Sequence, residues 1–177
     1  MFSSGGDLYF TDPPFGLPKA FDDPRKEIPF QGVYRLSKDG KLVLIIKDIK
    51  APNGIALSPD EKKLYVSDVN SERSAWLVYD LQPDGTVNNG RLFASADRWK
   101  KPPFFGPDGF KLDNKGNLFG ARPGGLSIFS PEGTHLGSIE TGMPASNVAW
   151  GDDGSTLYMT GGQSLYRVRL TAKGSRF

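Results

Sequence analysis

The sequence has no cysteine and a single histidine among its 177 residues. The missing cysteines exclude disulfide bonds and thiolate metal sites, although they leave the redox compartment open. Any bound metal is therefore expected to take hard oxygen ligands. The longest apolar run, Leu42 to Ile46, is too short to cross a bilayer, and no signal-peptide pattern opens the chain. We therefore expect no membrane partner and, by default, a cytoplasmic location.

The chain also lacks a strong charge bias and a helical hydrophobic period. Its formal net charge of +2 gives no support for a nucleic-acid partner, and none is expected. No stretch spaces its apolar residues as a helix would. Instead, 22 glycines and 14 prolines separate short apolar runs. This pattern is typical of the turns in an all-β chain.

One pattern occurs three times along the chain. Each copy has a polar residue, an apolar strand, a Gly/Asp turn and a second strand that begins Leu-Tyr or Leu-Phe. The copies are "APNGIALSPDEKKLYVSD" (51–68), "PDGFKLDNKGNLFGAR" (107–122) and "SNVAWGDDGSTLYMTG" (146–161). The polar residues Asn53, Asp108 and Asn147 precede the leucine of the second strand by 11, 10 and 10 residues. A fixed offset of this kind indicates an internal structural repeat.

A fourth copy, "GDLYFTD" (6–12), shows only the second strand of the unit, so we expect its first strand to be absent. Residues that open the repeated second strand are predicted to pack within and between the repeats: Leu8, Tyr9, Leu64, Tyr65, Leu157 and Tyr158.

Short apolar runs between turn residues predict four groups of strands. They lie at 8–11, 32–36 and 42–46; at 54–57, 63–67, 76–80 and 91–94; at 109–113, 117–121, 125–129 and 134–139; and at 146–150, 156–160 and 164–169. The turns "SKDGK", "QPDGT" and "SPEGT" suit hairpins because glycine accepts a positive φ. Repeated four-stranded meanders predict an incomplete β-propeller. We expect one partial domain, 1–177, with blade groups at about 1–50, 51–106, 107–145 and 146–177.

Five motifs in order resemble the SMP-30/gluconolactonase family. They are "LYFTDPPFGLP" (8–18), "FQGVYRLSKDGK" (30–41), "APNGIALSPDEKKLYVSD" (51–68), "PDGFKLDNKGNLF" (107–119) and "SNVAWGDDGSTLYMTGGQSLYRVRL" (146–170). The resemblance implies a six-bladed propeller that hydrolyses sugar lactones, with a divalent cation in its central channel. The chain matches about three and a half of the six blades.

The resemblance also implies a metal site of which this chain carries half. The matching ligands are Asn53 of "PNG" and Asp108 of "PDG". The family's other two ligands, a Glu and an Asn, have no counterpart here. We expect Ca²⁺ in the first place, with Mg²⁺, Mn²⁺ or Zn²⁺ as alternatives. The resemblance gives Asp108 a second role, as the base that activates water.

The residues are consistent with this chemistry but leave alternatives open. Inner strands of a propeller line its axis, so Asn53 and Asp108 should meet at one mouth of the channel. Amide and carboxylate oxygens suit a hard cation. Alternatively, the Asn-Gly and Asp-Gly pairs only form turns at strand entries. Glu27 and Asn147 are candidate substrate contacts. Alternatively, Glu27 is a solvated surface charge, and Asn147 only forms a turn at the entry of a strand.

Two functions follow from the sequence. The first is a metal-dependent lactonase that uses Asp108 to activate water. The second is a catalytically weak or inactive half-propeller that acts as a binding or structural module. In either case the uncovered blade faces predict association, and we expect a homodimer in which two halves make a closed or nearly closed ring, since symmetric closure buries both faces.

Overall fold

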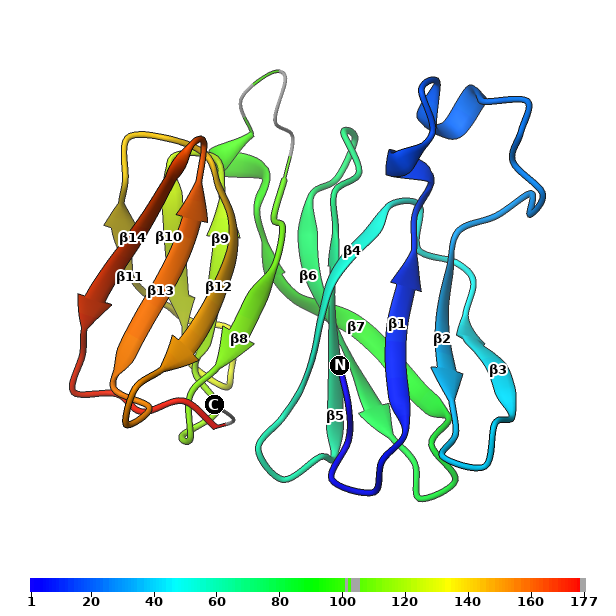
Figure 1. Cartoon of the computed structure of the whole chain (residues 1–177), viewed down its shortest axis with the longest axis horizontal. Coiled ribbons are helices and arrows are strands. Elements are labelled where there is room, and N and C mark those ends of the chain that lie inside the picture. The colour runs from blue at the N-terminus through cyan, green and yellow to red at the C-terminus, as the bar shows by residue number, and fades with distance from the viewer. Residues whose placement is uncertain (101, 103–105, 176–177) are drawn as a thin grey trace.

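The computed structural model describes residues 1–100, 102 and 106–175. These residues form an all-β structure with short 3₁₀ helices at Pro14–Gly16, Ala20–Asp22 and Asp97–Trp99 (Figure 1). The first two sheets contain β1 (Leu8–Asp12), β2 (Gly32–Leu36) and β3 (Leu42–Ile46), then β4 (Pro52–Leu57), β5 (Lys63–Asp68), β6 (Ala75–Leu81) and β7 (Val87–Ser95). The next two contain β8 (Phe110–Leu112), β9 (Leu118–Arg122), β10 (Gly125–Phe129) and β11 (His135–Glu140), then β12 (Ala145–Gly151), β13 (Thr156–Gly161) and β14 (Ser164–Arg169).

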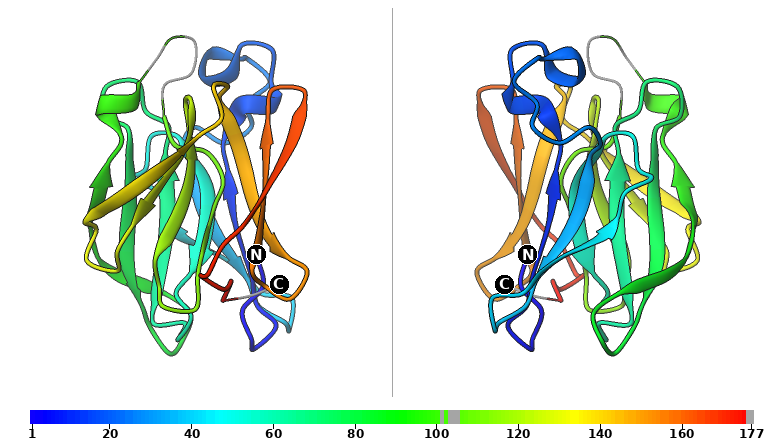
Figure 2. Two further views of the ribbon diagram at one scale, coloured as in Figure 1. Left: turned by 90° about the vertical axis from the view of Figure 1, so that its left-hand side faces the viewer. Right: turned by 90° about the vertical axis from the view of Figure 1, so that its right-hand side faces the viewer.

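Each sheet is an antiparallel meander whose strands pair in chain order. The described sheets hold three, four, four and three strands, which confirms the predicted grouping. Their first strands are neighbours in series, since β1 contacts β4, β4 contacts β8 and β8 contacts β12. The fold is thus an incomplete β-propeller, with the first and last sheets at its two ends (Figures 1 and 2).

The predicted hairpin turns form, and each contains a glycine with a positive φ. Gly40, Gly85 and Gly133 have φ values of +84°, +80° and +85°. Each donates its N–H to the carbonyl three residues earlier, at 2.8 to 2.9 Å. A side chain at such a φ would be strained, which explains the recurring Asp-Gly and Glu-Gly pairs.

Three buried clusters hold neighbouring sheets together. Tyr9 and Leu64 belong to the cluster between the first and second sheets. Trp76 and Phe110 belong to the cluster between the second and third, while Leu157 packs between the third and fourth. Burial of these apolar faces against their neighbours is the main stabilising contribution of the fold.

Two of the residues predicted to lie in the packed interior do not. Tyr9, Leu64, Tyr65 and Leu157 are buried as predicted, but Leu8 and Tyr158 are only half-buried. Side chains alternate between the two faces of a strand, so Leu8 points away from the neighbouring Tyr9. Leu8 and Tyr158 belong to the end sheets, which have a packed neighbour on one side.

The prediction that the first unit lacks its inner strand is confirmed, since β1 is the innermost of the three strands in its sheet. A two-residue segment nevertheless pairs with the free edge of β1. Phe2 pairs with Leu8 in an isolated antiparallel bridge. The Met1 ammonium donates to the Tyr9 carbonyl at 2.6 Å, and the Tyr9 N–H donates to the Met1 carbonyl at 2.8 Å. Met1 and Phe2 thus satisfy some of the backbone groups along the free edge of β1, which need hydrogen-bond partners.

In the part of the chain that is described, no helix is both long and apolar enough to cross a membrane.

Candidate functional site

The site lies where the inner strands of neighbouring sheets end. Asn53 is the second residue of β4, and Asp108 lies two residues before β8. The Asn53 Nδ2 donates a hydrogen bond of 2.8 Å to the Asp108 Oδ1. Residues 55 positions apart are therefore in direct contact, as the repeat predicted. The Thr11 hydroxyl, at the end of β1, donates to the Asn53 carbonyl at 2.6 Å, so a third sheet adjoins the pair.

The backbone of Asp108 is fixed from two sides. Its N–H donates to the Ala121 carbonyl at 3.0 Å, and the Ala121 N–H donates to the Gly109 carbonyl at 3.0 Å. The Gly109 N–H donates to the Ser146 carbonyl of the last sheet at 2.9 Å. Because both neighbouring strands hold this segment, the carboxylate is positioned by the scaffold rather than by a free loop.

Ser67 links the backbone of Gly54, which follows Asn53, to the backbone of Asp108, and the sequence reasoning missed it. This fully buried serine of β5 accepts a hydrogen bond of 2.7 Å from the Gly54 N–H. Its hydroxyl donates to the Asp108 carbonyl at 3.0 Å. The only local signal was the serine in "LYVSD". It is a polar residue within an otherwise apolar strand, and a buried polar group needs a hydrogen-bond partner.

Burial changes the acid–base properties of the site. Burial raises the pKa of the Asp108 carboxyl above its ordinary value, and the hydrogen bond from Asn53 offsets part of the rise. A raised pKa brings a carboxylate closer to the basicity that a general base needs near neutral pH.

A cleft of about 670 Å³ opens above Asn53 and Asp108. Both residues line it. Phe15 and Phe21 form an aromatic wall, with ring centroids 5.9 Å apart and ring planes at 85°. Pro123, which follows β9, lines another part of the cleft. The cleft volume suits a small organic molecule.

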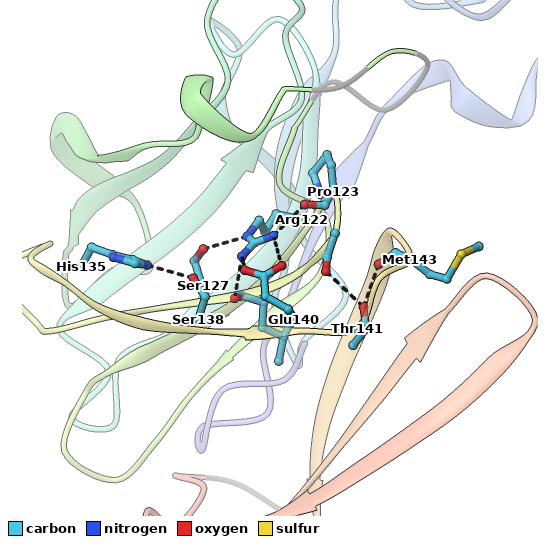
Figure 3. Close-up of polar contacts among 10 residues, drawn as sticks. Arg122, Pro123, Ser127, His135, Ser138, Glu140, Thr141 and Met143 are labelled. Atoms are coloured by element: carbon cyan, nitrogen blue, oxygen red, sulfur yellow. Dashed lines mark hydrogen bonds and ion pairs between the residues drawn. The ribbon is translucent and has the colours of Figure 1, made fainter.

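Arg122 supports the Pro123 side of the cleft (Figure 3). Its guanidinium is 2% exposed and donates to the Pro123 carbonyl at 2.8 Å and to the Ser127 hydroxyl at 2.9 Å. It also forms an ion pair with Glu140 of β11. A buried charge with this many partners fixes the β9–β10 turn in one geometry.

Neither of the two candidate substrate contacts is among the residues that line the cleft. Glu27 is exposed and lines a separate hollow of about 450 Å³. Asn147 lies within β12, where its Oδ1 accepts a hydrogen bond from the Val148 N–H at 2.8 Å. It packs against Gly109, because a Cβ on that glycine would lie 2.1 Å from the Asn147 Oδ1. Asn147 is thus next to Asp108 in space, whereas Glu27 is not among the cleft residues. Their roles as substrate contacts stay predictions.

The atoms that Asn53 and Asp108 offer are of the type that a hard cation prefers. The Asn53 amide and the Asp108 carboxylate supply oxygen atoms, which Ca²⁺ and Mg²⁺ prefer. In residues 1–100, 102 and 106–175, however, no group of three His, Cys, Asp or Glu side chains gathers to hold a metal. These two residues would therefore need further oxygen ligands to complete a cation site.

Comparison with known proteins identifies similar sequences and structures. Residues 1–163 match the family model described as the SMP-30/Gluconolactonase/LRE-like region. A gluconolactonase of Zymomonas mobilis is 43% identical over 98% of this chain and 50% of its own length. A lactonase of Staphylococcus aureus is 30% identical over 99% of this chain and 56% of its own.

A solved gluconolactonase structure from Xanthomonas campestris matches with a TM-score of 0.82 and 34% identity, over 96% of this chain and 55% of that one. The chain thus spans about half the length of the relatives it matches.

Proposed function

The chain belongs to the SMP-30/gluconolactonase/LRE-like family, and on this basis we propose that it contributes to the hydrolysis of a sugar lactone. The observation that carries the proposal is the hydrogen bond between Asn53 and Asp108, on the cleft, with the Asp108 carboxyl held at a raised pKa. The relatives named as gluconolactonase and lactonase support this reaction class.

In the proposed reaction, Asp108 is the general base. A water molecule attacks the lactone carbonyl carbon and gives a proton to the Asp108 carboxylate. The tetrahedral intermediate then collapses, the ring C–O bond breaks, and the departing alkoxide takes the proton back from the Asp108 carboxyl, which regenerates the base. The products are one carboxylic acid and one free hydroxyl on the same molecule. The apolar wall that includes Phe15 and Phe21 would limit the access of bulk water to the reacting carbonyl.

A divalent cation, Ca²⁺ in the first place, would be held by the oxygens of Asn53 and Asp108. When bound, it would polarise the lactone carbonyl and stabilise the negative charge that develops there. Of the described residues, these two are the protein ligands we propose, whereas Ca²⁺ takes about six to eight oxygens. We therefore expect weak cation binding by the chain alone.

The small ligand set favours a second candidate function. A half-propeller with two ligands and an open cleft would bind a small molecule without turning it over. Turnover in the presence of a cation separates the two functions, because a catalytic centre opens the lactone ring and a bare binding module only binds the molecule.

Substitutions at Asp108 test the proposal. The assay follows acid release from a sugar δ-lactone with added Ca²⁺, Mg²⁺, Mn²⁺ or Zn²⁺, corrected for spontaneous opening. Asp108→Ala should abolish any activity of the parent. Asp108→Asn keeps a metal-facing oxygen but cannot accept a proton, so it should retain some cation binding and lose turnover by about 10² to 10⁴.

The exposed Asp39, in the turn between β2 and β3, provides a matched control. Asp39→Asn should leave the rate unchanged. Hydrolysis at the parental rate by Asp108→Ala would reject the mechanism. A parent without activity would support the second candidate function.

A further inference from the structure

The cleft at Asn53 and Asp108 has a charged part as well as an aromatic one. Lys50 and Glu72 both line it, and their side chains form an ion pair with 2.5 Å between the Lys50 Nζ and a Glu72 carboxylate oxygen. The Lys50 ammonium holds the pKa of the Glu72 carboxyl below its ordinary value, so both groups are charged at neutral pH. The proposed hydrolysis gives neither of them a role.

The backbone that carries Lys50 is held close to Asn53. Ala51 follows Lys50, and its N–H donates to the Asp68 Oδ1 at 3.0 Å. The Ala51 carbonyl accepts a hydrogen bond of 2.9 Å from the Val69 N–H. Lys50 precedes Asn53 by three residues, which span at most about 11 Å. A cleft of about 670 Å³ is large enough for one small ligand to contact both the Lys50 side chain and the proposed reaction centre.

The loop that carries Glu72 is fixed by its own hydrogen bonds. The Glu72 N–H donates to the Asn70 Oδ1 at 3.0 Å, and the Lys100 Nζ donates to the Glu72 carbonyl at 2.9 Å. The Ser74 hydroxyl donates to the Asn70 carbonyl at 3.0 Å. The charged pair thus projects from two backbone segments whose positions are set by the fold, as a selective site requires.

The ion pair is accessible to a ligand. The Lys50 and Glu72 side chains are 64% and 74% exposed, so water reaches both charged groups and a ligand can replace that water. An ammonium has three donors, and a carboxylate accepts at two oxygens. An exposed ion pair contributes little to stability. Either residue can therefore be substituted with little effect on the fold.

The aromatic part of the cleft complements the charged pair. Phe15 and Phe21 are 44% and 43% exposed and line the same cleft. The C–H face of a sugar ring is apolar and can pack on such rings, whereas each hydroxyl group that leaves water needs a hydrogen-bond partner. The cleft therefore offers both kinds of contact that a hydroxylated ring requires.

We propose that Lys50 and Glu72 select a lactone that carries hydroxyl groups on adjacent ring carbons. One hydroxyl accepts a hydrogen bond from the Lys50 ammonium, and its neighbour donates one to the Glu72 carboxylate. The inference rests on the proposed function, because it assigns the specificity of the same cleft. A lactone without these hydroxyl groups leaves both charged groups without a ligand partner and is a poorer substrate.

The presence of both charges also distinguishes between neutral and anionic substrates. A negatively charged substituent at this position, such as a phosphate ester, would meet the Glu72 carboxylate, and like charges repel at short range. A hydroxyl group both donates and accepts, so it suits either member of the pair. The pair therefore favours a neutral hydroxylated lactone.

Paired substrates test the selection during turnover. Glucono-δ-lactone and δ-valerolactone have the same six-membered ring, but only the first carries hydroxyl groups on adjacent ring carbons. Lys50→Met and Glu72→Gln should each lower the ratio of kcat/KM for the first to that for the second by about tenfold, as expected for hydrogen bonds to charged groups. Arg91→Met breaks an exposed ion pair with Asp80, and neither residue lines the cleft, so this control should keep the parental ratio.

Binding of the ring-opened products tests the selection without turnover. Gluconate and 5-hydroxypentanoate share a carboxylate, but only gluconate has hydroxyl groups on adjacent carbons. In a titration followed by ligand NMR signals, the parent should bind gluconate about tenfold more tightly, and Lys50→Met should remove the difference. Circular dichroism of each variant checks that the β structure is retained.

The two experiments separate this inference from the proposed function. A parent that hydrolyses neither lactone but prefers gluconate contradicts the proposed reaction and supports the selection. A parent that hydrolyses lactones but binds both products equally, or does not bind gluconate, overturns the selection. So does an unchanged preference in both Lys50→Met and Glu72→Gln, or an equal loss of preference in Arg91→Met.

Discussion

At the residue scale, the proposed role of Asp108 and its burial have opposite effects on its charge. Its carboxylate must be charged to hold a cation or to accept a proton, yet burial raises its pKa and so disfavours that charge. The folded state then binds the proton more tightly than the unfolded chain does. The charged form costs stability at every pH above the folded pKa, and this cost disappears as the pH falls below the ordinary aspartate range.

Asp108→Asn should therefore raise the melting temperature at pH 7 without cations. The amide oxygen can still accept the hydrogen bond from Asn53, so the change removes mainly the charge. The gain should shrink as the pH falls through the folded pKa toward about 4, the ordinary value for aspartate. Thermal unfolding at the two pH values measures it, with Asp39→Asn as the exposed control. An equal gain at both pH values would show that the charge of Asp108 is not its cause.

At the element scale, the site depends on the close approach of β4 to the segment that precedes β8. A Cβ on Gly54 would lie 2.4 Å from the Asp108 carbonyl oxygen and 3.0 Å from the Gly109 Cα. Both atoms belong to the backbone and cannot rotate away. The glycine of the Asn-Gly pair is therefore required by the distance between neighbouring sheets.

Gly54→Ala should destabilise the fold by about 1 to 3 kcal/mol, because it overpacks the contact between two backbones. Gly137→Ala in β11 is the matched control, since a Cβ there meets no atom within 4 Å. That change should be neutral, or stabilising by about 0.5 to 1 kcal/mol. Urea unfolding measures the change as a shift in the denaturation midpoint, provided that the dependence of the unfolding free energy on urea concentration is the same for each variant. Equal midpoints for both variants would mean that β4 moves to accommodate the extra methyl group.

At the scale of the whole molecule, the C-terminal segment ties the last sheet to the third. The Asn114 N–H donates to the Lys173 carbonyl at 2.7 Å, and the Gly174 N–H donates to the Gly154 carbonyl at 2.9 Å. The Ser175 N–H donates to the Leu112 carbonyl at 3.2 Å. The segment therefore joins turns of two neighbouring sheets, at the end of the arc where the C-terminus lies in Figure 1.

A chain that ends at Ala172 should lose these links. Three hydrogen bonds at about 0.5 to 1.5 kcal/mol each predict a loss of about 2 to 4 kcal/mol in the free energy of unfolding. A chain that ends at Ser175 provides the baseline, so that the loss is assigned to residues 173–175. Hydrogen exchange should show the weakest protection in β12–β14. Uniform protection across all four sheets would indicate that the segment does not couple them.

Much of the fold could be predicted from the sequence because its determinants are local. Alternation of apolar and polar residues sets each strand, and glycines such as Gly40 and Gly85 set the turns between strands. Even the register of the repeat placed Asn53 and Asp108 at equivalent positions of neighbouring units. That equivalence was enough to predict their contact, since propeller units are related by a rotation about one axis.

Only the tertiary structure decided what each polar residue does with its hydrogen bonds and which apolar residues stay uncovered. Asn147 has the same register as Asn53, yet its amide oxygen bonds to the adjacent Val148 N–H. The role of Ser67 depends on the folded chain, in which its hydroxyl on β5 donates a hydrogen bond to the Asp108 carbonyl. Leu8 and Leu64 open the same repeated strand, yet one is half-exposed and the other is buried. The sequence determines the strand and its alternation, but the presence of a neighbouring sheet determines burial, and that depends on the position of the unit in the arc.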